Sequence, residues 1–89
     1  MNSKPIHQLR REIDAIDRAL LRLWSRRLKI AREIGKRKRA QMLPMKDVGR
    51  ERQVLMRAVK AGKALNLPRS KARHLMNIII ASSRQTQKR

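Results

Sequence analysis

Two cations interrupt an apolar stripe in the first half of this 89-residue chain. Ile and Leu recur at spacings of three and four, but the step from Leu23 reaches Arg27 before Ile30, and the step from Ile34 reaches Lys38. A guanidinium at a core position costs on the order of several kcal/mol unless it meets an anion. On a helix, residues eleven apart point within about 20° of each other and lie roughly 16 Å apart. The pair could grip a small dianion; snorkelling of both side chains to solvent is the alternative.

A second charged cluster is the pattern D-x-x-R-E, formed by Asp47, Arg50 and Glu51. Its two carboxylates are the only acids in the final fifty-six residues of a chain with 25 Lys and Arg against six Asp and Glu. A helix cap explains Asp47 well, whereas a favourable charge near a helix start explains Glu51 only loosely. The cluster is therefore a second candidate for contacts with a ligand.

The last segment changes character in a similar way. The helical stripe of Met76 and Ile79 continues into Ser83 and Gln87, so its final turns present polar groups. Such groups at core positions could face a ligand that offers hydrogen bonds. Fraying near a C-terminus produces the same pattern, and this segment alone does not decide between the two.

The net charge of +19 is extreme for this length. It predicts attraction to polyanions and self-repulsion in the folded state. Nucleic-acid binding is therefore one hypothesis, although one Trp with no Tyr or Phe leaves almost no stacking platform for single strands. A solvated basic surface that binds polyanions nonspecifically explains the charge equally well.

Composition also limits the class of protein. The chain has no Cys, which excludes disulfides and thiolate metal sites, and His7 and His74 are isolated. No apolar run approaches the length of a membrane span, and the N-terminus lacks the apolar stretch of a signal peptide. We expect one soluble, cytoplasmic domain, residues 1–89, with no metal and no other cofactor.

One very long helix must position the cations. The spacing of apolar residues from Ile6 to Ile34, without Pro or Gly between them, predicts a helix from about residue 5 to about residue 40. This helix would be roughly 50 Å long, whereas a compact globule of this size has a radius of gyration of about 12 Å. No other segment is long enough to cover its stripe. We therefore predict a homodimer in which long helices pair.

Two shorter helices complete a predicted all-α fold. Asp47 can cap a helix that runs to about residue 65, with Asn66 as its stop. Pro68 suits the first turn of a third helix that reaches about residue 87. The residues expected to face the core are Leu55 and Val59 of the second helix and Ala72, Leu75, Met76, Ile79 and Ser83 of the third.

The chain carries specific motifs over the continuous stretch from about Leu9 to Gln87. They are the segments LRREIDAIDRALLRL, RRLKIAREIGKRK, PMKDVGRER, GKALNL and IIIASSRQTQ. In these segments the chain resembles the all-helical chorismate mutases, and most of all the mutase domain of bacterial bifunctional chorismate mutase–prephenate dehydratases. The resemblance implies an intertwined homodimeric helical bundle. It also implies conversion of chorismate, a dianion, to prephenate in aromatic amino-acid biosynthesis, without a cofactor.

The resemblance further implies which residues act on the reacting bonds. Arg27 and Ser83 would bind substrate carboxylates, Lys38 would contact a carboxylate and the ether oxygen, and Gln87 would donate to that oxygen. The rearrangement is unimolecular, so holding a compact conformer and stabilising negative charge on the ether oxygen suffice. The implied catalytic set is Arg27, Lys38, Glu51 and Gln87.

The remaining implied roles concern the ring hydroxyl and the partner chain. Asp47 and Glu51 would receive the ring hydroxyl, with Arg50 packed between them and the ligand. Arg10 would reach into the partner's pocket. Arg10 precedes Arg27 by seventeen residues, about 26 Å along one helix, so a single chain cannot bring both to one pocket. Antiparallel long helices in a dimer can.

Three features depart from the family pattern. They are the high positive charge, Trp24 where a smaller aliphatic residue is expected near the dimer seam, and an end two residues past Gln87, from which we expect no dehydratase or regulatory domain. Isochorismate–pyruvate lyase, which shares the fold and the cationic pocket, is an alternative, but the D-x-x-R-E segment favours the mutase. A basic nucleic-acid-binding protein explains the charge but not Arg27 on an apolar stripe.

Overall fold

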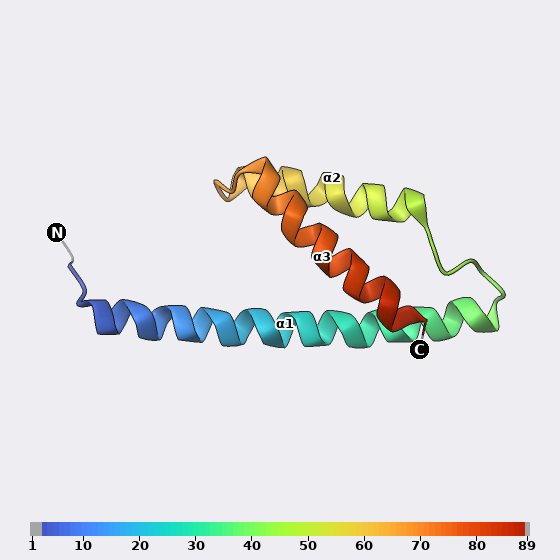
Figure 1. Cartoon of the computed structure of the whole chain (residues 1–89), viewed down its shortest axis with the longest axis horizontal. Coiled ribbons are helices and arrows are strands. Elements are labelled where there is room, and N and C mark those ends of the chain that lie inside the picture. Colours follow the sequence, from blue (N-terminus) through green and yellow to red (C-terminus); the bar gives the residue numbers. More distant parts are fainter. Residues whose placement is uncertain (1–2, 89) are drawn as a thin grey trace.

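The computed structural model describes residues 3–88, and within them the chain forms three α-helices and no strand. They are α1 (Ile6–Ala40), α2 (Val48–Ala64) and α3 (Arg69–Gln87). These bounds confirm the predicted all-α class and agree with each predicted helix to within one residue. α3 packs against both other helices, whereas α1 and α2 do not pack against each other (Figure 1). None of the three combines the length and the apolar character that a bilayer crossing requires.

Capping hydrogen bonds and backbone conformation mark the ends of the two short helices. Asp47 caps α2 by accepting a hydrogen bond of 3.0 Å from the backbone N–H of Arg50. α2 ends in a Schellman motif, with Asn66 at a φ of 61° and the Leu67 N–H donating to the Gly62 carbonyl at 2.7 Å. Pro68 was expected in the first turn of α3, but it lies one position earlier, at the N-cap, with extended backbone.

The long helix overshoots the rest of the chain. The molecule measures 58 × 23 × 14 Å, and its radius of gyration is 16.7 Å, against about 12 Å for a compact chain of this length. The apolar residues of the stripe on α1 are 43% to 67% exposed; they are Ile6, Leu9, Ile13, Ile16, Leu20, Leu23, Ile30 and Ile34. Neither α2 nor α3 covers this stripe.

The core of the single chain is small and lies where α3 meets its neighbours. Ala31, Ala72, Ile80 and Ser83 are the buried side chains of this region. Burial of Ala72 and Ser83 agrees with the predicted stripe of α3. Leu75 was expected to face the core, but it is exposed, because α3 packs on two helices and its buried face turns toward Ile80.

The end of α3 approaches α1 closely at Gly35 (Figure 1). A Cβ at this position would lie 2.5 Å from the backbone oxygen of Gln87 and 2.7 Å from its Cα. Arg39 adds a hydrogen bond of 2.6 Å from its guanidinium to the same oxygen. The absence of a side chain at Gly35 therefore fixes where the last turn of α3 lies against α1.

Replacing Gly35 with Ala should destabilise the protein by up to about 2 kcal/mol. The new methyl group meets backbone, at a cost of about 1–3 kcal/mol, and helix propensity returns about 1 kcal/mol. Urea unfolding followed by circular dichroism at one fixed protein concentration measures the difference.

Gly49→Ala is the matched control, since its Cβ would meet only the Asp47 carboxylate, at an ordinary 3.6 Å. It should be neutral or stabilising. A Gly35→Ala protein as stable as the parent would contradict the close approach of α1 and α3.

Candidate active site

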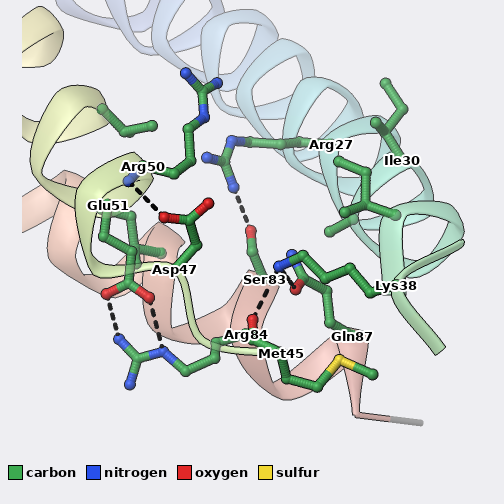
Figure 2. Close-up of a pocket in the computed structure, with 14 residues that line it drawn as sticks. Arg27, Ile30, Lys38, Met45, Asp47, Arg50, Glu51, Ser83, Arg84 and Gln87 are labelled. Carbon is green, nitrogen blue, oxygen red and sulfur yellow. Dashed lines mark hydrogen bonds and ion pairs between the residues drawn. The ribbon is translucent and has the colours of Figure 1, made fainter. Parts of the chain in front are cut away.

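A cavity of about 410 Å³ lies among the C-terminal half of α1, the start of α2 and the end of α3 (Figure 2). This volume suits a small-molecule ligand. Seven of the eight predicted site residues line it: Arg27, Lys38, Asp47, Arg50, Glu51, Ser83 and Gln87. Arg10, the eighth, does not. It lies on an exposed part of α1 near the helix start, about 26 Å along the axis from Arg27.

Arg27 lies against the cavity rather than extending into solvent (Figure 2). Its guanidinium donates to the hydroxyl of Ser83, a side chain that is only 8% exposed. Within residues 3–88, no carboxylate pairs with Arg27. Burial, and secondly the nearby charge of Arg50, lower the pKa of Arg27 below its ordinary value. The site thus holds a cation whose charge an anionic ligand would stabilise.

Lys38 and Gln87 form a second donor group on the cavity wall. The Lys38 ammonium donates to the Met45 carbonyl and to Oε1 of Gln87, each at 2.9 Å. An ammonium has three N–H groups, so one remains for a ligand. Because Lys can only donate, the Gln87 amide must turn its oxygen to Lys38, which leaves its NH₂ group to donate elsewhere.

The end of α3 is therefore not a frayed terminus. The helix continues through Gln87, Ser83 is buried, and both residues face the same cavity as Arg27 and Lys38 (Figure 2). The stripe becomes polar because its last two turns line a cavity instead of an apolar core.

The D-x-x-R-E cluster lies across the cavity from α1. Asp47 performs the capping role that the sequence suggested, and it lines the cavity as well. The guanidinium of Arg50 donates to Oε1 of Gln53 at 2.7 Å. Glu51 is bound by Arg84 of α3 in a two-pronged ion pair, with distances of 3.1 Å from Nε to Oε2 and 2.8 Å from Nη2 to Oε1.

Arg84 is the charged cavity residue that sequence reasoning missed. It follows buried Ile80 by four positions, which places it on the same side of α3. That spacing was available in the sequence, but the predicted stripe ran through Ile79 instead. Met45 was also missed, because its contribution to Lys38 is a backbone carbonyl, which residue type does not reveal.

The cavity can bind anions and can stabilise negative charge that develops on a bound molecule. Its cations and N–H donors come from all three helices, while Ile30, Ile34 and Val54 supply apolar wall. No group of three His, Cys, Asp or Glu side chains suited to a metal ion occurs in the part of the chain that the structure describes. Such a site suits a reaction that depends on binding one conformer and on electrostatic stabilisation.

Comparisons with known proteins agree with this chemistry. The chain is 37% identical over 86 residues to the bifunctional chorismate mutase/prephenate dehydratase of Escherichia coli K12, covering 97% of this chain and 22% of that protein. It is 31% identical over 87 residues to the protein of the same name from Aquifex aeolicus VF5, covering 94% of this chain and 24% of that protein. The chain thus spans about a fifth to a quarter of the length of these relatives.

A solved structure is similar to this chain in both fold and sequence. A conserved hypothetical protein from Pyrococcus furiosus superposes with a TM-score of 0.77 at 35% identity, covering 97% of this chain and 99% of that one. The sequence pattern of chorismate mutase type II matches residues 9–88, which include every cavity residue. With the fold, the cationic cavity and this match in agreement, the chain belongs to the chorismate mutase type II family.

Proposed function

We propose that this chain is a chorismate mutase of aromatic amino-acid biosynthesis, an isomerase that converts chorismate to prephenate. The observation that carries the proposal is the cavity in which Arg27 and Lys38, without carboxylate partners among residues 3–88, stand beside the Gln87 amide. Residues 1–89 act as one mutase domain in this proposal. A cytoplasmic location suits a biosynthetic enzyme of this family.

Binding of both substrate carboxylates selects the reactive conformer. Arg27, with Ser83 beside it, receives one carboxylate, and Lys38 contributes to binding on the same wall. The chorismate ring must fold over its side chain before the new carbon–carbon bond can form. Fixing both ends of the dianion supplies this arrangement without a covalent intermediate.

Lys38 and Gln87 stabilise the ether oxygen as its bond to carbon breaks. Negative charge grows on this oxygen in the transition state, so donors aimed at it lower the barrier more than they strengthen substrate binding. Asp47 and Glu51 receive the ring hydroxyl, and Arg50 packs between these acids and the ligand. The reaction then needs no general base.

The function is tested by following the loss of chorismate absorbance with purified protein. Lys38→Ala should lower kcat by about 10²–10³-fold, the usual cost of one donor to a developing oxyanion. Lys36→Ala removes the same charge from an exposed position of α1 and should retain parental activity. A parent protein without activity would contradict the proposal, as would equal losses in the two variants.

Gln87→Glu should make the reaction strongly pH-dependent. The Gln87 amide lies 2.9 Å from the Lys38 ammonium, and a carboxylate there is held ionised near neutrality. It would then offer no donor and would oppose negative charge on the ether oxygen. Activity should therefore be low at pH 7.5 and should rise as pH falls toward 5, because protonation restores an O–H donor.

The measurement is kcat/KM against pH for the parent and for Gln87→Glu, with circular dichroism at each point. The parent should change much less over this range. Equal activity of the two proteins at pH 7.5 would mean that the amide of Gln87 does not contact the breaking bond.

We further propose that two chains form an intertwined homodimer. The apolar stripe of α1 is exposed along its length in the single chain, and a second α1 has the length needed to cover it. Fully burying one Leu or Ile contributes about 1.5–3 kcal/mol, so the stripe offers a large driving force. Antiparallel pairing would bring Arg10 of each chain toward the cavity of the other, where it would bind a carboxylate.

A mixing experiment tests the shared site. Arg10→Ala and Lys38→Ala proteins should each be nearly inactive alone, because every cavity of each homodimer lacks one residue. After subunit exchange, activity should return, since one of the two cavities of the mixed dimer contains both Arg10 and Lys38.

Sedimentation equilibrium at low micromolar concentration and moderate salt should give twice the chain mass and should verify the mixed dimer. A compact monomer, or a mixed dimer that stays inactive, would contradict the role of Arg10.

The alternatives from the sequence are not favoured. The match to chorismate mutase type II covers residues 9–88, and the relatives that are 31% to 37% identical carry the mutase name. The exposed Lys and Arg side chains still support weak, nonspecific binding of polyanions, which salt should screen.

A further inference from the structure

The cavity holds two acids among four cations, and both acids are already engaged. Asp47 accepts the backbone N–H of Arg50 at the start of α2. Glu51 is bound by Arg84. Consequently neither carboxylate forms an ion pair with Arg27 or Lys38, which bind only neutral oxygens within residues 3–88.

The Arg84–Glu51 pair is built to hold its carboxylate in one direction. Each oxygen of Glu51 accepts its own N–H, at 2.8 and 3.1 Å, in the fork-to-fork geometry that fixes both position and orientation. The side chains are 24% and 36% exposed for Glu51 and Arg84. Figure 2 shows the Glu51 carboxylate directed toward Arg84 and away from Arg27 and Lys38.

Without Arg84, the Glu51 carboxylate would face a cavity that contains three other cations. A half-buried guanidinium such as Arg27 attracts a nearby carboxylate more strongly than solvent-exposed groups attract each other. Glu51 would then occupy the place of a substrate carboxylate and oppose binding of a dianion.

We propose that Arg84 is a positioning residue for substrate binding. It holds the Glu51 carboxylate on the side of the cavity opposite Arg27 and Lys38, and so keeps these two cations free for the carboxylates of the substrate. This inference rests on the proposed mutase function. Arg84 acts through Glu51 and does not itself contact the substrate.

The test is a cycle of variants read out as KM and kcat for chorismate. Arg84→Met keeps an unbranched stem but removes the guanidinium fork, and it should raise KM at least about tenfold, with kcat changed by less than about threefold. Adding Glu51→Gln to this variant removes the freed charge. The double variant should then have a KM within about threefold of Glu51→Gln alone, which means that the second change suppresses the first.

Arg52→Met is the control for net charge, because Arg52 is exposed and neighbours Glu51 in the chain. This substitution removes the same charge as Arg84→Met. Its KM should stay near the parental value. An unchanged KM in Arg84→Met, additive effects in the double variant, or an equal rise in Arg52→Met would each overturn the proposal. A parent without mutase activity would instead overturn the proposed function.

Circular dichroism and sedimentation establish that each variant keeps its fold and its state of association. If Arg84→Met does not fold, Arg84→Lys replaces it in the same cycle, since Lys keeps the charge but cannot bind both oxygens of Glu51 as a fork. Its KM should rise about threefold or more, and Glu51→Gln should again suppress the rise. Parental KM in Arg84→Lys, or a rise that Glu51→Gln leaves in place, would then overturn the proposal.

Discussion

The close contact of α3 with α1 at Gly35 sets the geometry of the cavity wall that these two helices form. At Gly35 the backbone of Gln87 lies so close to α1 that no side chain would fit between them. With the last turn of α3 fixed there, the Gln87 amide meets Lys38, and one turn earlier the Ser83 hydroxyl meets Arg27. The two donor groups of the site thus depend on one backbone approach between helices that are distant in sequence.

The cations and the acids of the cavity bind different kinds of partner. The cations of α1 are satisfied by neutral groups, namely a hydroxyl, a carbonyl and an amide oxygen. The acids are satisfied by a backbone N–H and by Arg84. Neutral acceptors orient a cation without cancelling its charge, and the lowered pKa of Arg27 reflects this cost of burial. Such a cavity leaves the charge of its cations available for an anionic ligand.

Much of this arrangement could be predicted from the sequence, because local signals were strong. Apolar spacing without Pro or Gly determined α1, Asp47 marked the start of α2, and Asn66 marked its end. Arg27 and Lys38 stood out because cations on an apolar stripe are costly. Each of these inferences needed only residues within one helix.

The missed features depend on packing between helices. Arg84 and Glu51 are 33 residues apart, and nothing in either segment indicates that they meet. Leu75 was expected to face the core but is exposed, and Ile80 is buried instead, because α3 packs on two helices at once and a single helical stripe cannot describe two contact faces. Arg10 stays a prediction because its proposed partner lies on another chain.

The exposed stripe of α1 also has a consequence for mass action. Few side chains of residues 3–88 are buried in the single chain, so much of the apolar surface that could stabilise the fold lies on a face that a second copy would cover. In the proposed dimer, folding and association would then be one equilibrium, and the midpoint of unfolding would move with the logarithm of protein concentration. A higher concentration of the chain would therefore stabilise its fold, and dilution alone would favour unfolding.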